Sequence, residues 1–196
     1  MDCYCLLFDG FESLDLTAPV SLLQRMPDMR LHYVSHQGGM VPSQQGFAID
    51  TVPVWVPEPA STLLIPGGQG VRLLTEHQDF LYDLAIWAGQ AQTCLSVSNG
   101  SALLAAAGCL DGVRATTDKR TFAWAQNLAA NVHWQPFAAW VHDGKFYSAS
   151  GMTAGMDMTL SFIADRYGKD LAETVAAQSE YVWQRHADAP APRRVF

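Results

Sequence analysis

Ser98 is the side chain in this sequence that is best placed to do chemistry. It follows a short apolar run over residues 93–97 and precedes an Ala- and Leu-rich segment that stops at Gly108. This pattern predicts a strand, a sharp turn and a helix, the arrangement known as a nucleophile elbow. The turn would hold the hydroxyl clear of the sheet, and free N–H groups at the start of the helix would stabilise a developing oxyanion.

Other interpretations of Ser98 stay open on the residues alone. Serine is a favourable N-cap, so Ser98 can simply begin its helix. Its hydroxyl is a poor nucleophile without a base to take its proton, and the sequence supplies no obvious base nearby. Cys94 does not replace it, because that thiol would lie at the opposite end of the strand, roughly 13 Å away at about 3.3 Å per residue.

Three segments are expected to meet near Ser98, because ligands of parallel sheets bind beyond the carboxyl ends of the strands. These segments are residues 9–15, 66–70 and 98–100. Gly67, Gly68 and Gly70 form either a tight strand-to-helix turn or a loop that cradles an anion. Asp15 falls in an apolar stretch, where it is either a solvated aspartate or an acid of the site.

Short apolar runs alternate with helical patterns along the chain. The predicted strands are residues 3–8, 31–35, 62–65 and 93–97, and the predicted helices of this half are residues 12–26 and 78–88. Such strand–helix alternation indicates an α/β fold with a parallel sheet covered on both faces.

The remaining segments extend this pattern. Residues 36–51 predict a hairpin or loop excursion, and Asp143-Gly144 predicts the turn of a second hairpin between residues 138–142 and 145–149. Further helices are expected over residues 122–130, 153–167 and 170–179. The length suits one domain over residues 1–185, followed by an irregular tail over residues 186–196.

Composition narrows the classes of partner. The chain has 196 residues, a net charge of −7 and only 12 Lys and Arg, which argues against direct nucleic-acid binding. Its start lacks the features of a signal peptide, and no apolar run reaches the roughly 18 residues of a membrane span, so a cytoplasmic location is expected. Four cysteines in or beside apolar segments suit reduced, packed thiols. Cys3 and Cys5 share one strand face, but further ligands at suitable spacing are lacking, so neither a metal nor a cofactor is expected.

Several motifs, in order, resemble the ThiJ/PfpI family of the class I glutamine amidotransferase-like superfamily. They are Leu-Asp-Leu-Thr-Ala-Pro at 14–19, Leu-Leu-Ile-Pro-Gly-Gly at 63–68, Ser-Val-Ser-Asn-Gly at 96–100, and the segments 103–112, 114–117 and 150–157. The resemblance spans residues 2–181 and is strongest to isonitrile hydratases and to ligand-binding domains of AraC-type regulators. It implies a flavodoxin-like three-layer α/β/α sandwich, which is usually a homodimer.

The resemblance also implies roles for individual residues. Ser98 matches the nucleophile, where the family carries cysteine, and Asp15 matches the acid that approaches it. The backbone N–H groups of Gly68 and Asn99 match the oxyanion pocket, which Gly67 adjoins. We therefore expect a strained backbone at Ser98 and Asp15 within hydrogen-bond reach of it.

A second departure from the family lies at Asp118, where a histidine usually follows Thr-Thr. None of this chain's six histidines matches a catalytic position of the family, so surface or structural roles are expected for all of them: His32, His36, His77, His133, His142 and His186. Both departures remove reactivity, because a helix N-terminus can shift a thiol to its thiolate while a serine needs an aligned base.

Two classes of function follow. The first is binding of a small-molecule ligand in a pocket that resembles that of the isonitrile hydratases. In this pocket Ser98 replaces the usual cysteine and leaves the usual activity weak or absent, as in a ligand-sensing domain. The alternative is an active hydratase, a lyase, or an amidase-like enzyme that acts on a small electrophile. A protease or a deglycase ranks lower, because the likeness is to the hydratases.

Overall fold

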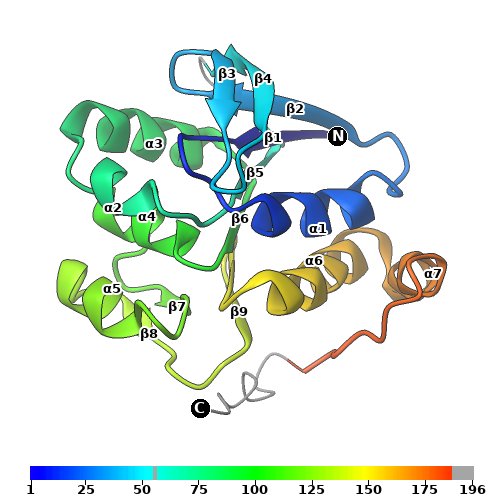
Figure 1. Ribbon diagram of the computed structural model, residues 1–196. Coiled ribbons are helices and arrows are strands. Elements are labelled where there is room, and N and C mark those ends of the chain that lie inside the picture. Colours follow the sequence, from blue (N-terminus) through cyan, green and yellow to red (C-terminus); the bar gives the residue numbers. More distant parts are fainter. Residues whose placement is uncertain (55–56, 187–196) are drawn as a thin grey trace.

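A mostly parallel sheet forms the centre of the structure, a computed structural model that describes residues 1–54 and 57–186, and within these residues the sheet has eight strands (Figure 1). Its spatial order is β3-β4-β2-β1-β5-β6-β10-β9. The strands are β1 (Asp2–Leu6), β2 (Arg30–Ser35), β3 (Gly39–Pro42), β4 (Ala48–Pro53), β5 (Thr62–Ile65), β6 (Thr93–Val97), β9 (Trp140–Asp143) and β10 (Phe146–Ala149). Only the two outermost pairs, β3–β4 and β9–β10, are antiparallel.

Helices cover both faces of this sheet (Figure 1). One layer holds α1 (Ser13–Leu23), α6 (Met152–Tyr167) and α7 (Lys169–Gln178), and the other holds α2 (Val71–Leu74), α3 (Gln78–Gln90), α4 (Gly100–Ala106) and α5 (Phe122–Leu128). The predicted three-layer α/β/α sandwich with a mostly parallel sheet is therefore confirmed.

The central strands are buried on both faces, which explains their continuous apolar sequences. Every residue of β5 and β6 is buried, and each strand pairs in parallel with its neighbours. Because the chain leaves each of these strands at the same edge of the sheet, the loops after β1, β5 and β6 meet there.

The elements differ from the sequence prediction mainly at their ends. The first strand stops at Leu6, and α1 is shorter than the predicted residues 12–26 and contains Pro19. Both predicted hairpins are present, and Gly144 in the second turn has a φ of 59° that suits glycine. The four-residue helix α2 and the small pair β7 (Arg114–Ala115) and β8 (His133–Trp134) were not predicted.

Other expectations concern the whole chain. The single domain over residues 1–185 stays a prediction, and residues 187–196 of the predicted tail lie outside the described residues. In the part of the chain that the structure describes, no helix is both long enough and apolar enough to span a membrane. The four cysteines are free thiols, and three of them, Cys3, Cys5 and Cys94, are buried.

Candidate functional site

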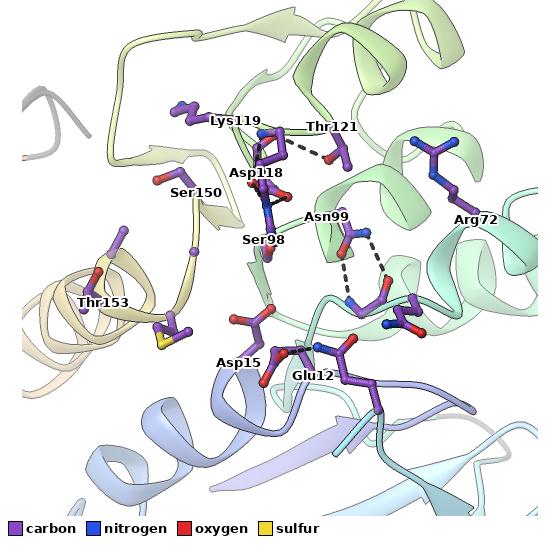
Figure 2. A pocket seen from close by; sticks show the side chains of 17 residues that line it. Glu12, Asp15, Arg72, Ser98, Asn99, Asp118, Lys119, Thr121, Ser150 and Thr153 are labelled. Atoms are coloured by element: carbon purple, nitrogen blue, oxygen red, sulfur yellow. Dashed lines mark hydrogen bonds and ion pairs between the residues drawn. The ribbon is translucent and has the colours of Figure 1, made fainter. Parts of the chain in front are cut away.

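A cavity of about 740 Å³ opens at the carboxyl edge of the sheet (Figure 2). Its walls come from the loops after β1, β5 and β6, from the segment before α5 and from the start of α6. The residues that line it are Glu12, Asp15, Gln44, Gly68, Gln69, Arg72, Ser98, Asn99, Asp118, Lys119, Arg120, Thr121, Ser150, Gly151, Met152, Thr153 and Ala154. Four of the five residues singled out from the sequence, Asp15, Gly68, Ser98 and Asn99, thus line one cavity.

Ser98 has the backbone that the elbow prediction requires. Its φ of 55° lies in the left-handed region, which costs a residue other than glycine about 1–3 kcal/mol. The strain is held by hydrogen bonds: the Ser98 N–H donates to the Ala149 carbonyl at 2.9 Å, and the Ser98 carbonyl accepts from the hydroxyls of Ser101 and Thr117 at 3.2 Å. The N-cap of α4 is Asn99, so the interpretation of Ser98 as a helix cap is wrong.

Asp15 is a buried acid of the site, not a solvated surface residue. Its exposed fraction is 2%, and its Oδ2 accepts a hydrogen bond from the Gly67 N–H at 3.2 Å. Burial, and next the negative charge of Glu12, raise the pKa of Asp15 to about 7, although the Gly67 N–H lowers it. Near neutral pH this carboxyl can therefore both accept and release a proton.

Gly67 lies where Asp15, Ser98 and Asn99 converge. A Cβ placed on Gly67 would come within 2.4 Å of the Asn99 Oδ1 and within 2.8 Å of both the Asp15 Oδ2 and the Ser98 Cβ. Only glycine leaves this space free. Within the described residues no hydrogen bond joins Asp15 to Ser98, although the Asp15 Oδ2 and the Ser98 Cβ both lie 2.8 Å from the same point beside Gly67.

The Gly68 turn is closed by the Asn99 side chain. The Gly68 N–H donates to the Asn99 Oδ1 at 2.9 Å, and the Asn99 amide donates to the Gly68 carbonyl at 3.1 Å (Figure 2). Gly68 also has a φ of 145°, and a Cβ there would meet the Gly10 carbonyl oxygen at 2.3 Å. The glycines therefore form a tight turn, and the Gly68 N–H reaches an oxyanion only after Asn99 releases it.

The wall before α5 carries three charged residues to which the sequence assigned no role in the cavity. Asp118 is buried and pairs with the Arg120 Nε at 3.0 Å. Lys119 lies beside them, and burial lowers its pKa to about 8. Across the cavity mouth, the Arg72 guanidinium lies 5.0 Å from the ring centre of Trp124. The sequence pointed to this wall only through Asp118, which stands where the family usually carries a histidine.

The opposite wall is the start of α6, which belongs to the motif over residues 150–157. Ser150 and Thr153 face the cavity there (Figure 2). One turn further, Asp157 anchors the chain after α7, because its Oδ1 accepts from the Tyr181 hydroxyl at 3.0 Å and from the Gln184 N–H at 2.8 Å. The terminal segment thus supports the helix that forms this wall.

The histidines lie outside the cavity. None of the described residues that line it is a histidine; His32 and His36 instead contact Asp2 and Asp83 at 2.7 and 2.8 Å. His77 caps α3. Within residues 1–54 and 57–186 no group of three or more His, Cys, Asp or Glu is arranged to hold a metal ion.

Comparison with known proteins gives consistent results. The sequence model of the DJ-1/PfpI family matches residues 1–165. The chain is 35% identical over 190 residues to isonitrile hydratase from Pseudomonas putida, and this alignment covers 95% of this chain and 78% of that protein. A ThiJ/PfpI family protein from Pseudomonas syringae superposes with a TM-score of 0.80 at 27% identity, over 92% of this chain and 74% of the other. An AraC family transcriptional regulator from Pseudomonas putida shares the fold with a TM-score of 0.75 at 20% identity, over 91% and 98% of the two chains.

Proposed function

Because this chain belongs to the DJ-1/PfpI family, we propose that its cavity binds a small electrophilic molecule of the isonitrile class and that Ser98 turns this ligand over weakly or not at all. The chain is a homologue of an isonitrile hydratase. A site that binds without turnover would serve as a ligand-sensing domain.

The observation that carries the proposal is the left-handed Ser98 beside the buried Asp15. A backbone strained in this way persists only where surrounding contacts hold it, and such residues cluster at functional sites. The hydroxyl is thereby presented to a cavity large enough for a small organic ligand.

Weak turnover follows from three features of the same residues. The resemblance implies a cysteine at the position of Ser98, and a serine hydroxyl attacks only when a base removes its proton. Asp15 is not hydrogen-bonded to that hydroxyl, and the Gly68 N–H is engaged by Asn99 instead of being free for an oxyanion. Each feature raises the barrier to attack by Ser98.

Slow hydration is the second candidate, and the pKa of Asp15 favours it. The Ser98 oxygen would add to the isonitrile carbon while Asp15 takes the hydroxyl proton and returns it to that carbon, which gives an imidate ester. Water would then add to this ester and release Ser98 together with an N-substituted formamide. A carboxyl with a pKa of about 7 suits both proton transfers at neutral pH.

Titration calorimetry with an alkyl isonitrile tests the proposal when it is combined with a blocked cavity. Gly67→Ala places a methyl group between Asp15, Ser98 and Asn99, so it should weaken binding at least tenfold. Gly89→Ala is the matched control, because a Cβ at Gly89 in α3 meets nothing within 4 Å and binding should not change.

Formamide release, followed by mass spectrometry, separates the two candidates. Binding without formamide supports the binding site, and release that Ser98→Ala abolishes supports slow hydration. Equal isonitrile affinity in the wild type and Gly67→Ala would refute both.

A further inference from the structure

The charged side chains that line the cavity differ in whether another group of the protein already holds them. Asp118 pairs with the Arg120 Nε at 3.0 Å. The Lys119 amine donates to the Thr116 Oγ1 at 2.7 Å and to the Ala138 carbonyl at 2.8 Å. These three charged groups are therefore engaged by the wall before α5 itself.

Glu12 lies across the cavity from Asp118 and is held as well (Figure 2). Its Oε1 accepts from the Leu14 N–H at 3.1 Å and from the Gln45 amide at 2.8 Å, and its Oε2 accepts from the Gln44 amide. Three neutral donors thus bind this carboxylate, and both glutamines belong to the turn between β3 and β4. Glu12 therefore needs no cation from the cavity.

Arg72 lines the cavity from α2 and has no such partner (Figure 2). Within residues 1–54 and 57–186 no carboxylate oxygen lies within ion-pair distance of its guanidinium, and its side chain donates no hydrogen bond to another residue. The guanidinium instead lies over the ring of Trp124, 5.0 Å from the ring centre, and this ring packs against the core. An aromatic face attracts the cation but is no hydrogen-bond acceptor of the carboxylate kind, so the N–H donors of Arg72 stay available to a ligand.

The charge and the shape of this group indicate which ligand it suits. The whole chain has a net charge of −7, yet this cation in the cavity wall is not paired with a carboxylate of the described residues. Its planar fork of N–H donors matches the two oxygens of a carboxylate. A dianion such as a phosphate monoester would be repelled by the carboxylates of Glu12 and Asp118, which line the same cavity. A single carboxylate is therefore the favoured partner of Arg72.

We propose that Arg72 binds a carboxylate group of the ligand, so that the cavity prefers isonitriles that carry a carboxylate over neutral ones. This inference rests on the proposed isonitrile site and names its class of ligand, because Arg72 and Ser98 line the same cavity. The isonitrile carbon lies beside Ser98, and the guanidinium donates two parallel hydrogen bonds to the carboxylate. Contact with Trp124 orders the Arg72 side chain before the ligand arrives, which lowers the entropy cost of binding.

Titration calorimetry with paired ligands tests the proposal. The ligands are ω-isocyano carboxylates with two to five methylene groups, each compared with its neutral methyl ester. The acid whose chain spans the distance from Ser98 to Arg72 should bind the wild type at least tenfold more tightly than its ester. In Arg72→Gln the ratio of the two affinities should fall to about one, because the charge is lost. Arg72→Lys should give an intermediate ratio, because lysine keeps the charge without the planar fork.

Arg114→Gln is the matched control, because it also removes one positive charge, from an exposed residue of β7 that is not among those that line the cavity. The preference for the acid should persist in this variant. Esters that bind the wild type as tightly as their acids would overturn the role of Arg72 and leave the proposed isonitrile site standing. A preference for the acid that persists in Arg72→Gln would overturn that role too. If neither acids nor esters bind the wild type, both proposals fail.

Discussion

Replacing Asp15 by Asn removes a buried carboxyl and keeps an acceptor for the Gly67 N–H. In the wild type, a pKa that rises from 3.8 to about 7 on folding corresponds to about 4 kcal/mol. Below pH 4 both the folded and the unfolded chain hold this proton, so the folded state has its full stability. Between pH 4 and 7 only the unfolded chain releases it, and the free energy of unfolding therefore falls.

Urea unfolding followed by tryptophan fluorescence measures this effect. The stability of Asp15→Asn minus that of the wild type should grow by up to about 4 kcal/mol from pH 4 to pH 7 and then remain constant. Asp50→Asn removes an exposed carboxyl from β4 and is the control for a general charge effect. A difference between Asp15→Asn and the wild type that does not change with pH would refute the assignment of Asp15 as a buried, protonated acid.

Two further predictions concern the terminal segment and the assembly. Asp157→Ala removes the acceptor of the Tyr181 hydroxyl and of the Gln184 N–H. It should therefore lower the free energy of unfolding by roughly 1–3 kcal/mol and speed trypsin cleavage after Arg185, and Tyr181→Phe should have a smaller effect. Equal cleavage rates in the wild type and both variants would contradict this anchoring. Light scattering should give twice the 21.5 kDa of one chain, because the exposed side chains of Leu14 on α1 and Met152 on α6 lie on two helices that pack together. A mass of one chain at high concentration would contradict a homodimer.

The parts of the fold that could be predicted are those encoded by neighbouring residues. A short apolar run before Ser98 and an Ala-rich segment after it define the elbow locally, and Asp143-Gly144 defines its hairpin in the same way. The helix α2 and the two-residue strands β7 and β8 escaped prediction, because elements this short have no periodicity and form through contacts with distant segments.

The candidate site likewise combines features that the sequence predicts with features that it does not. Asp15, Ser98 and Asn99 could be placed together because each follows or precedes a recognisable strand or helix. That the Asn99 side chain occupies the Gly68 N–H, or that the Lys119 amine donates to the Ala138 carbonyl, depends on residues that lie 31 and 19 positions apart in the sequence. Such contacts are decided by the folded geometry, which a pattern of residue types does not contain.

Ser98→Cys tests the central claim most directly, namely that the cavity is a family site whose nucleophile is a hydroxyl. The left-handed backbone and the Asp15 carboxyl remain in this variant, and a thiol beside a helix N-terminus is activated by its lowered pKa. We expect the new cysteine to react with iodoacetamide far faster than Cys3, Cys5, Cys94 or Cys109, and formamide release from an alkyl isonitrile to rise at least a hundredfold over the wild type. A cysteine at position 98 that reacts no faster than these four thiols and hydrates nothing would contradict the claim.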